Sequence, residues 1–577
     1  MDSISVVDNQ AKESGGGIYG IIQNYDDWTF ENILVAKNLV SNSTSSGNSD
    51  GGGGIHINGE GNATFNHATI VDNHIDGYGF GGGIQKGGGN ASVYVYNSII
   101  WYNTGYEANG NATGINLYYS NMEDEGWSGN NNISVEPHFC DIGNGDYTLN
   151  NYSPCLGAGE NGLDMGAYGQ GCILQLETIH IHSEGSDELG DGSESLPFAT
   201  IQYGINEAST YDTVLVNSGT YNQSFEYAGK NIVVTGMGIE STILDGTGLS
   251  EPVVQIIENE TNYAVLQNLK ITNSEYQVGE SYSGAVVVNG ADPIIRNVHI
   301  TQSDSRGMYF IESSAYLYNV EIDNNTNDPG NTFDGGGIKG YNSPIHLDSV
   351  YIHDNWGGKG GGIQTDFIYW PISYPVLRIT NSRIVNNTAY NGGGGISLDD
   401  TNILLDKVLI ANNYTNTYGG GIRVENAAFL EIRNSTIANN LDNVEVGGYR
   451  GHNLSVSLPE SFSSGCQECS QLKIENSIIW QEIESALEWG AGIYYGQNDM
   501  TENQFLELVD YSVILEMDGV SENPQFTDSE NYDYSLQYIS PCIDTGNPDL
   551  DGDGEDYTTD IDDQDPDSTR MDMGAFY

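Results

Sequence analysis

Short runs of alternating apolar and polar residues, separated by glycine and asparagine, make up most of this chain. The string Gly-Gly-Gly-Ile opens such a run at residues 15–18, 52–55, 81–84, 335–338, 360–363, 393–396 and 419–422. A second apolar run and an asparagine follow. Alternation with a period of two predicts β-strands, and extended helical patterns are few.

The second apolar run repeats with an Ile or Val in a matching place. These positions, mostly 22 to 35 residues apart, are 35, 70, 100, 271, 300, 322, 352, 384, 410, 437 and 479. A unit of that length cannot bury its apolar face alone, so it must stack on copies of itself. The sequence therefore predicts an all-β fold, a parallel β-solenoid.

Three segments occur twice and indicate two tandem solenoids. NSIIW at 97–101 returns at 476–480, SPC at 153–155 returns at 540–542, and DMGAY at 164–168 matches DMGAF at 572–576. We predict a first β-helix over 1–172 and a second, complete one over 173–577. Because SVVDN (5–9) already matches TIVDN (69–73), the first is expected to begin inside a coil and to be truncated at its N-terminus.

The second solenoid is expected to begin with a cap. After the strand TIHIHSEG, a helix-like spacing links Pro197, Phe198, Ile201, Ile205 and Ala208. Proline favours a helix start, and an amphipathic helix near 197–209 would cover the open end of the stack.

These residues carry a family resemblance. GSDELGDGSESLPFATIQYGINEA, DTVLVNSGTY, GKNIVV and STILDG resemble the opening of right-handed parallel β-helix proteins of the pectin-lyase-like superfamily. The segment from SPC to DMGA is similar to the end of many secreted bacterial β-helix proteins. The GGGI and IxxN repeats are similar to those of polymorphic outer-membrane autotransporter passengers, with Ile or Val replacing their Phe. The superfamily holds polysaccharide lyases, hydrolases and epimerases as well as noncatalytic surface proteins, so the fold does not choose among them.

Charge narrows the environment and the partners. The 577 residues include 80 acidic and 17 basic ones, for a formal charge of -63. Such a surface repels nucleic acid and anionic membrane, and there is no apolar run of 18 residues, so neither nucleic-acid binding nor membrane insertion is expected. The self-repulsion needs salt or divalent cations, which favours an extracellular or cell-surface location. The N-terminus lacks a signal peptide, and we expect the chain to be a fragment of a secreted protein.

Six cysteines, at 140, 155, 172, 466, 469 and 542, indicate an oxidising compartment only weakly. Cys466 and Cys469 form a CxxC that fits a zinc half-site, a redox pair or a local disulfide. No second CxxC and no nearby His follows, which favours a disulfide or free thiols.

The repeated asparagines and glycines have structural explanations. Asn325, Asn387, Asn413 and Asn440 end the second strand of successive coils, where amides can stack and hydrogen-bond from coil to coil. The glycine triplets permit sharp corners and close backbone approach.

The residues after each GGGI offer candidate chemistry. With the Ile directed inward, the next residue and the third are expected to face solvent. This gives a first row of Lys339, Gln364, Ser397 and Arg423, and a second row of Tyr341, Asp366, Asp399 and Glu425. Counting from the preceding Asn-Asn pair places Tyr449 at the next Ile position, so that Arg450 and His452 extend the two rows.

The expected catalytic residues are Asp366, Asp399, Glu425 and His452, stacked at roughly the 4.8 Å spacing of strands, with Arg423 and Arg450 beside them. Carboxylates at such a short distance from one another must share protons, pair with arginine or hold a cation, as they do in polysaccharide-cleaving sites. QTD, LDD and RGHN are similar to acidic and His motifs of β-helix hydrolases, whose Gly-His-Gly and Arg-Ile-Lys elements are missing here. The alternative is a polar solenoid face with partial salt bridges.

A calcium site is predicted near the C-terminus. DLDGDGEDYTTD places Asp549, Asp551 and Asp553 at loop positions 1, 3 and 5, the Glu555 carbonyl at 7 and Asp560 at 12. This resembles the calcium loop of EF-hands and dockerins, with Asp in place of the bidentate Glu. A solvated acidic loop is the alternative.

Two functions follow from these patterns. The first is a secreted or cell-surface β-helix that binds glycans or acts in adhesion without catalysis, since tyrosine-rich strands suit sugar contact. The second is a polysaccharide lyase, hydrolase or epimerase that uses the acidic, His and Arg residues of the second helix. Neither pattern predicts an organic cofactor or an oligomeric state.

Overall fold

The computed structural model divides the chain into two compact units, Met1–Gln175 and Leu176–Tyr577. The residues described are 2–12, 14–43, 51–77, 81–103, 108–109, 114–123, 130–275, 283–326, 335–366, 377–399, 401–425, 429–443, 452–457, 471–480, 493–495, 509–510, 512–514, 523–531, 533–547 and 569–574. Within them, no helix is both long and apolar enough to cross a membrane.

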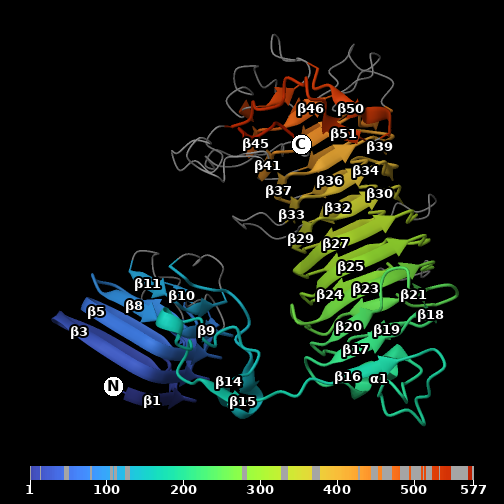
Figure 1. The fold of residues 1–577 in the computed structure, drawn as a ribbon. Coiled ribbons are helices and arrows are strands. Elements are labelled where there is room, and N and C mark those ends of the chain that lie inside the picture. The colour runs from blue at the N-terminus through green and yellow to red at the C-terminus, as the bar shows by residue number, and fades with distance from the viewer. Residues whose placement is uncertain are drawn as a thin grey trace. The chain divides into compact units, whose positions relative to one another are not determined.

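Parallel strands stack coil upon coil in the first unit. Its main sheet runs in the order β1 (Asp2–Val7), β3 (Ile18–Ala36), β5 (Ile55–Val71), β7 (Ile84–Lys86) and β10 (Ala108–Asn109). Figure 1 labels β1, β3, β5 and β10 of this sheet. Strands β8 (Ser92–Tyr96), β9 (Ile99–Trp101), β11 (Ile115–Tyr118) and β12 (Asn121–Met122) join the same sheet, and β2 (Gln10–Ala11), β4 (Leu39–Ser43) and β6 (His74–Gly77) form a second one. Identical residues meet in register: Phe30 opposes Phe65, with ring centroids 4.7 Å apart.

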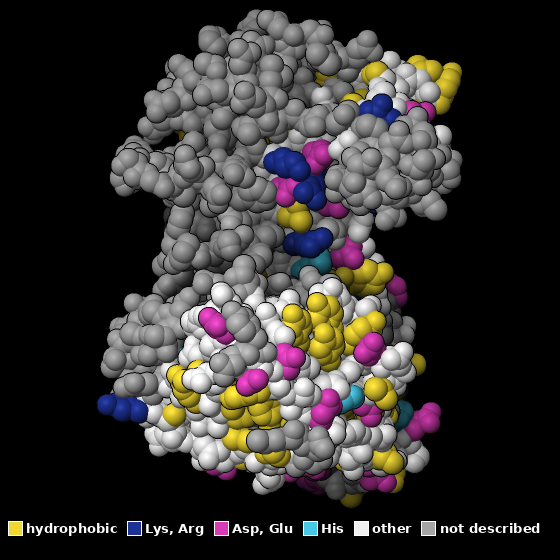
Figure 2. Space-filling model, turned by 90° about the vertical axis from the view of Figure 1, so that its left-hand side faces the viewer, with side chains coloured by type: hydrophobic (Ala, Val, Ile, Leu, Met, Phe, Trp, Pro, Cys, Tyr) yellow, Lys and Arg dark blue, Asp and Glu magenta, His cyan; other side chains and the backbone are white. Residues whose placement is uncertain are grey.

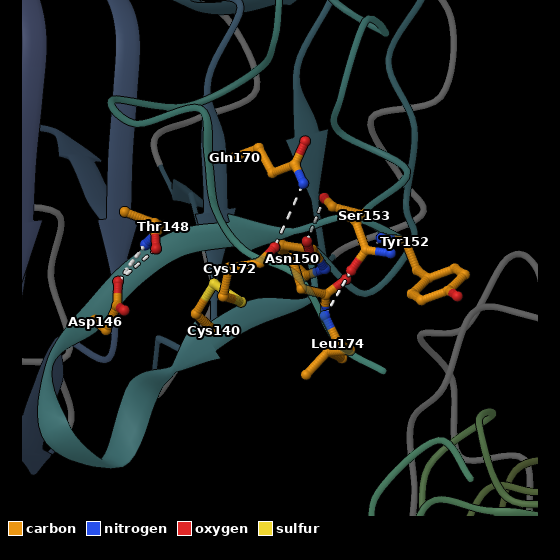
Figure 3. Close-up of a disulfide and its surroundings, with 11 residues drawn as sticks. Cys140, Asp146, Thr148, Asn150, Tyr152, Ser153, Gln170, Cys172 and Leu174 are labelled. Carbon is orange, nitrogen blue, oxygen red and sulfur yellow. Dashed lines mark hydrogen bonds between the residues drawn. A yellow bond between two sulfur atoms is a disulfide. The ribbon is translucent and has the colours of Figure 1, made fainter. Parts of the chain in front are cut away.

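A disulfide closes the first unit. Strand β13 (Phe139–Asp141) pairs antiparallel with β14 (Asp146–Asn150), which pairs parallel with β15 (Gln170–Cys172). Cys140 and Cys172 are bonded across this small sheet, as Figure 3 shows. Cys155 is a buried free thiol, and burial raises its pKa to about 12, so it has little thiolate character.

Three parallel sheets make up most of the described part of the second unit, beside the antiparallel pair of β50 (Phe526–Asp528) and β51 (Asp533–Leu536). The longest runs from β16 (Thr178–Ile181) through β25 (Ile294–Thr301), β27 (Ala315–Asp323) and β30 (Tyr351–His353) to β49 (Val513–Ile514). Figure 1 labels β16, β25, β27 and β30 along it. The second includes β24 (Val286–Asn289), β26 (Met308–Ile311), β28 (Ile338–Tyr341), β32 (Ile363–Asp366), β36 (Ile396–Asp399), β40 (Ile422–Glu425) and β44 (Leu454–Ser457). The third is β31 (Trp356–Gly357), β35 (Thr388–Ala389), β39 (Tyr414–Thr415) and β43 (Leu441–Asp442).

The core of this unit is a set of vertical apolar stacks. Ile338, Ile363, Ile396 and Ile422 face one another strand by strand, and all four are fully buried. Because each coil buries its apolar residues against the coils above and below, the stack is stabilised mainly by hydrophobic contact between neighbours. The predicted parallel β-helix is confirmed; the proposal that the two units are tandem copies stays a prediction.

Asparagine side chains form a ladder from coil to coil, as predicted. Asn355 donates both its backbone N–H and its side-chain amide to Asn387 Oδ1, at 3.1 and 3.0 Å, and Asn387 binds Asn413 in the same way. The ladder continues through Asn440 to Asn453. The first Asn of each pair has another role: Asn386 takes a left-handed φ of 56°, which asparagine tolerates well.

A short helix follows the first strand of the second unit and lies within the predicted range. Helix α1 spans Ile201–Glu207, and the Thr200 side chain caps it by accepting the Tyr203 N–H. Ile201 and Ile205 are buried against the first strands, so the helix covers apolar surface at the end of the stack.

The SPC and DMG segments make the same bonds in both units. Ser153 Oγ donates to the Pro137 carbonyl and Ser540 Oγ to the Pro524 carbonyl, each at 2.5 Å. Met165 N–H bonds the Cys155 carbonyl at 2.9 Å, and Met573 N–H bonds the Cys542 carbonyl at 3.0 Å.

Candidate functional site

The side chains that leave the outer side of β28, β32, β36 and β40, here called the GGGI face, fall in two rows. In the strand register, Lys339 lies opposite Gln364, Gln364 lies opposite Ser397, and Ser397 lies opposite Arg423. Tyr341, Asp366, Asp399 and Glu425 pair in the same order. The predicted alignment of these four coils is confirmed.

The exposure of the two rows differs from the expectation. The first row was expected to face solvent, yet Lys339 is 5% exposed, Gln364 1% and Ser397 6%. Only the second row reaches solvent appreciably, since the side chains of Asp366 and Glu425 are 28% and 29% exposed. A ligand would therefore meet the carboxylates first and the first row behind them.

Each carboxylate with a resolved partner is held by a neighbour on the same face. Lys339 Nζ pairs with Asp366 Oδ2, and Gln364 Nε2 donates to Asp366 Oδ1. Arg423 Nη2 pairs with Glu425 Oε1. Charge-assisted hydrogen bonds of this kind are about twice as strong as neutral ones, so the rows are fixed in place.

The extension of the rows to the next coil was wrong. Leu454, not Tyr449, opposes Ile422, and Ser457, not His452, opposes Glu425. His452 and Asn453 occupy the corner that the glycines hold elsewhere, because Gly421 and Ile422 bond their carbonyls. His452 Nδ1 accepts the backbone N–H of Asp442, so this buried ring is part of a turn and is not brought to the carboxylate rows.

Several predicted residues lie outside the described part of the chain. They are Arg450, the CxxC cysteines 466 and 469, and the calcium-loop residues Asp549, Asp551, Asp553, Glu555 and Asp560. Among the residues that are described, no group of three or more His, Cys, Asp and Glu side chains could hold a metal ion. The calcium site stays a prediction.

Sequence reasoning missed a second polar cluster, here called the His–carboxylate strip: His299, Glu321, Asp323 and His353. His299 Nε2 lies 2.6 Å from Asp323 Oδ1, and His353 Nε2 lies 3.2 Å from Glu321 Oε1. Tyr351 stacks on His353 with ring centroids 3.9 Å apart. The strip thus joins β25, β27 and β30 through side chains as well as backbone.

A signal for this strip was present in the sequence. His299, Glu321 and Tyr351 each precede, and Asp323 and His353 each follow, one of the repeated isoleucines 300, 322 and 352. Since residues on either side of an inward isoleucine point outward, the same alternation that defined the GGGI face also defines this one.

The environment of Asp323 shifts its titration. Burial alone would raise its pKa, but the hydrogen bonds from His299, Thr301 and Asn324 outweigh that effect and lower the pKa to about 2. Asp323 is therefore a fixed negative charge at neutral pH, suited to orienting His299.

A third polar feature lies on the side of the stack where β29, β33, β37, β41 and β45 are labelled in Figure 1. In Figure 2 this side carries a column in which Lys and Arg alternate with Asp and Glu. On β41 (Phe429–Arg433) and β45 (Gln471–Glu475), Lys473 bonds Glu475 at 3.0 Å and Arg433 pairs with Glu431. The two cationic side chains are largely exposed, whereas Glu431 and Glu475 are buried beneath them, so the pairs keep these buried carboxylates neutralised.

Comparison with known proteins gives few relatives. No protein-family model matches the chain, and no curated protein matches it. Pectate lyase Pel9A is a similar solved structure, with 12% identity, a TM-score of 0.43 and coverage of 70% of this chain and 97% of that one. A rhamnogalacturonan lyase is similar with 13% identity and a TM-score of 0.34, and the match covers 69% of this chain and 95% of that one. XylC in complex with xylose is similar with 10% identity and a TM-score of 0.31, and the match covers 55% of this chain and 82% of that one.

These likenesses are too distant to carry an argument about a site. The strand pairing itself shows the fold: in the described part of the chain, long parallel sheets stack coil on coil beside one short α-helix, as in a parallel β-helix. The roles of the site residues are therefore argued from the contacts that this chain itself makes.

Proposed function

We propose that the second unit binds polysaccharide on the GGGI face and does not cleave it. The observation that carries this proposal is the engagement of the carboxylates. Both oxygens of Asp366 and one of Glu425 already accept hydrogen bonds from Lys339, Gln364 and Arg423. A catalytic acid or base needs such an oxygen free to exchange a proton with the substrate.

The geometry of the face suits an extended glycan. Its rows run along the solenoid at the strand spacing of roughly 4.8 Å, so equivalent contacts recur from coil to coil. Aromatic rings lie beside the rows. Tyr309 on β26 lies opposite Lys339 on β28. Tyr418 is 38% exposed, and its ring centroid lies 6.0 Å from Cζ of Arg423. Tyrosine presents an apolar ring with a polar tip, which suits the faces and hydroxyls of sugars.

An extracellular or cell-surface setting accords with this function. The Cys140–Cys172 disulfide is of the kind that persists in oxidising compartments. The acidic surface, with a formal charge of -63, favours a saline setting or one that contains calcium. We propose that calcium binds the loop that starts at Asp549 and stiffens that end of the chain.

A polysaccharide-cleaving enzyme is the second candidate, and one observation favours it. His299 is paired with the ionised Asp323, an arrangement that orients an imidazole for proton transfer. Lys270 and Glu321 flank His299 in the same outward row, on β23 (Val265–Thr272) and β27. On this alternative, catalysis would use the His–carboxylate strip instead of the GGGI face.

A glycan panel separates the two candidates. The full chain is incubated with alginate, polygalacturonate and several neutral polysaccharides, and both binding and chain length are measured. Retention of the protein on a glycan without new reducing ends or unsaturated products supports binding. Cleavage that Asp399→Ala leaves intact and His299→Gln abolishes would replace our proposal by the enzyme alternative.

A further inference from the structure

Two hydrogen-bonding atoms of the GGGI face have no partner within the described part of the chain. Gln364 Oε1 is a buried acceptor, and Arg423 Nη1 is a buried donor. The assignment of the Gln364 amide is fixed by its other end: Nε2 donates to Asp366 Oδ1, and a carboxylate can only accept. The oxygen is therefore the atom left over.

Such atoms are costly in a folded protein. A buried polar atom without a partner costs about 1–3 kcal/mol, and native structures contain few of them. Gln364 is 1% exposed, so bulk water does not serve its oxygen. The two atoms belong to one row, with the small Ser397 between them on β36.

The cations of the face are already committed. Lys339, whose side chain is 6% exposed, pairs with Asp366, and Arg423 pairs with Glu425. An anionic sugar would therefore meet cations whose charge Asp366 and Glu425 already balance, on a face that carries three carboxylates. In a chain with a formal charge of -63, that approach is also opposed at long range.

We propose that the GGGI face is selective for a neutral, hydroxyl-rich glycan over an anionic one. A sugar hydroxyl donates a hydrogen bond to Gln364 Oε1, and a second sugar oxygen accepts a hydrogen bond from Arg423 Nη1. A hydroxyl can donate to Gln364 Oε1, whereas a carboxylate placed there only accepts and would leave that oxygen unsatisfied. Because the hydroxyls of a uronate can also donate to this oxygen, the discrimination against an anionic glycan comes from repulsion between its carboxylates and those of the face. This selectivity rests on the proposed function and makes it more specific.

The experiment compares the full chain on neutral and anionic polysaccharides in affinity gels at several salt concentrations. Hydroxyethyl cellulose, xylan and mannan are the neutral probes; polygalacturonate and alginate are the anionic ones, each with and without calcium. We expect retention by at least one neutral glycan and by no anionic glycan, with little dependence on salt.

Two variants connect the selectivity to the named atoms. Gln364→Leu removes the unpartnered oxygen, and Arg423→Lys keeps the charge but removes Nη1. Each should weaken neutral-glycan binding about ten-fold, since about 1.4 kcal/mol corresponds to a factor of ten. Gln267→Leu, on β23 and away from the face, is the matched control and should bind as the parent does.

The outcomes discriminate between the two levels of the proposal. Retention by no glycan at all overturns the proposed function together with this inference. Retention by anionic glycans alone overturns the selectivity and leaves glycan binding standing. Neutral binding that neither variant weakens overturns the assignment to Gln364 and Arg423; if Gln364→Leu fails to fold, as judged by circular dichroism, Arg423→Lys decides alone.

Discussion

His299 Nε2 lies 2.6 Å from Asp323 Oδ1 and joins two neighbouring coils through their side chains. His299 belongs to β25 and Asp323 to β27, and their strands also pair through the backbone. Because both side chains are only 14% and 11% exposed, the contact is poorly screened by solvent. It gives the second unit an interaction whose strength depends on the charge of Asp323.

We predict that this contact makes the second unit less stable in acid. Asp323 has its pKa lowered from 3.8 to about 2, so its contribution is fully present above pH 3.8 and is lost as the pH falls through 2. The contribution is on the order of 2 kcal/mol. Urea unfolding at pH 5 and at pH 2.5 measures it, and Asp323→Asn should remove that part of the difference.

Asp304→Asn, a change to an exposed carboxyl beyond the end of β25, serves as the control and should lose stability in acid as the parent does. Equal acid sensitivity of the parent and Asp323→Asn would contradict the role given to this carboxylate.

The asparagine ladder predicts a large effect from a single amide. In Asn387→Ala, the buried backbone N–H of Asn355 loses its acceptor and the side-chain amide of Asn355 loses one of three. The bonds that the Asn387 amide donates to the Ile352 and Val385 carbonyls and to Asn413 Oδ1 are lost as well. The loss should be at least about 3 kcal/mol, measured by urea unfolding. Asn386→Gly is the matched control, because glycine adopts the same left-handed backbone and Asn386 is exposed. Similar stability for the two variants would refute a structural role for the ladder.

How far the sequence predicted this fold depended on coil length. The offset from each Gly-Gly-Gly-Ile placed Gln364, Ser397 and Arg423 correctly in one row. Where that string is missing, the prediction relied on the distance from the preceding asparagine, which is nine residues from Asn413 to Ile422. The next coil is longer, since Leu454 lies fourteen positions after Asn440, so the same count put His452 in the wrong place. Alternation gives the direction of a side chain, but an insertion in a corner leaves no mark in the strands that flank it.

The His–carboxylate strip was missed for a different reason. Its residues flank isoleucines that the repeat had already aligned, but the glycine triplets drew attention to the other sheet. The burial of Gln364 and Lys339 was also out of reach, because alternation predicts which way a side chain leaves the strand and not what covers it.

The glycine triplets predict a steric effect in the first unit. A Cβ on Gly53 would lie 2.6 Å from the Gly82 carbonyl oxygen and 2.9 Å from that of His74, both backbone atoms of neighbouring chain segments. Gly53→Ala should therefore destabilise the unit by about 1–3 kcal/mol, seen as a lower thermal midpoint. At Gly88 a Cβ meets nothing within 4 Å, so Gly88→Ala should leave the midpoint unchanged or slightly raised. An equal fall of the thermal midpoint in both variants would show that the close backbone approach at Gly53 is not the reason why glycine is needed there.

The calcium prediction has a control inside its own loop. If Asp549, Asp551 and Asp553 supply carboxylates while Glu555 supplies only its backbone carbonyl, then Asp551→Ala should abolish calcium binding and Glu555→Ala should not. Calcium at about one hundred times its dissociation constant would stabilise the folded chain by about 2.7 kcal/mol, and a chelator would reverse this. Thermal unfolding with calcium and with magnesium measures the effect. An equal response to both ions, or an unchanged response in Asp551→Ala, would mean that the loop is simply an acidic surface that screens its charge with any divalent cation.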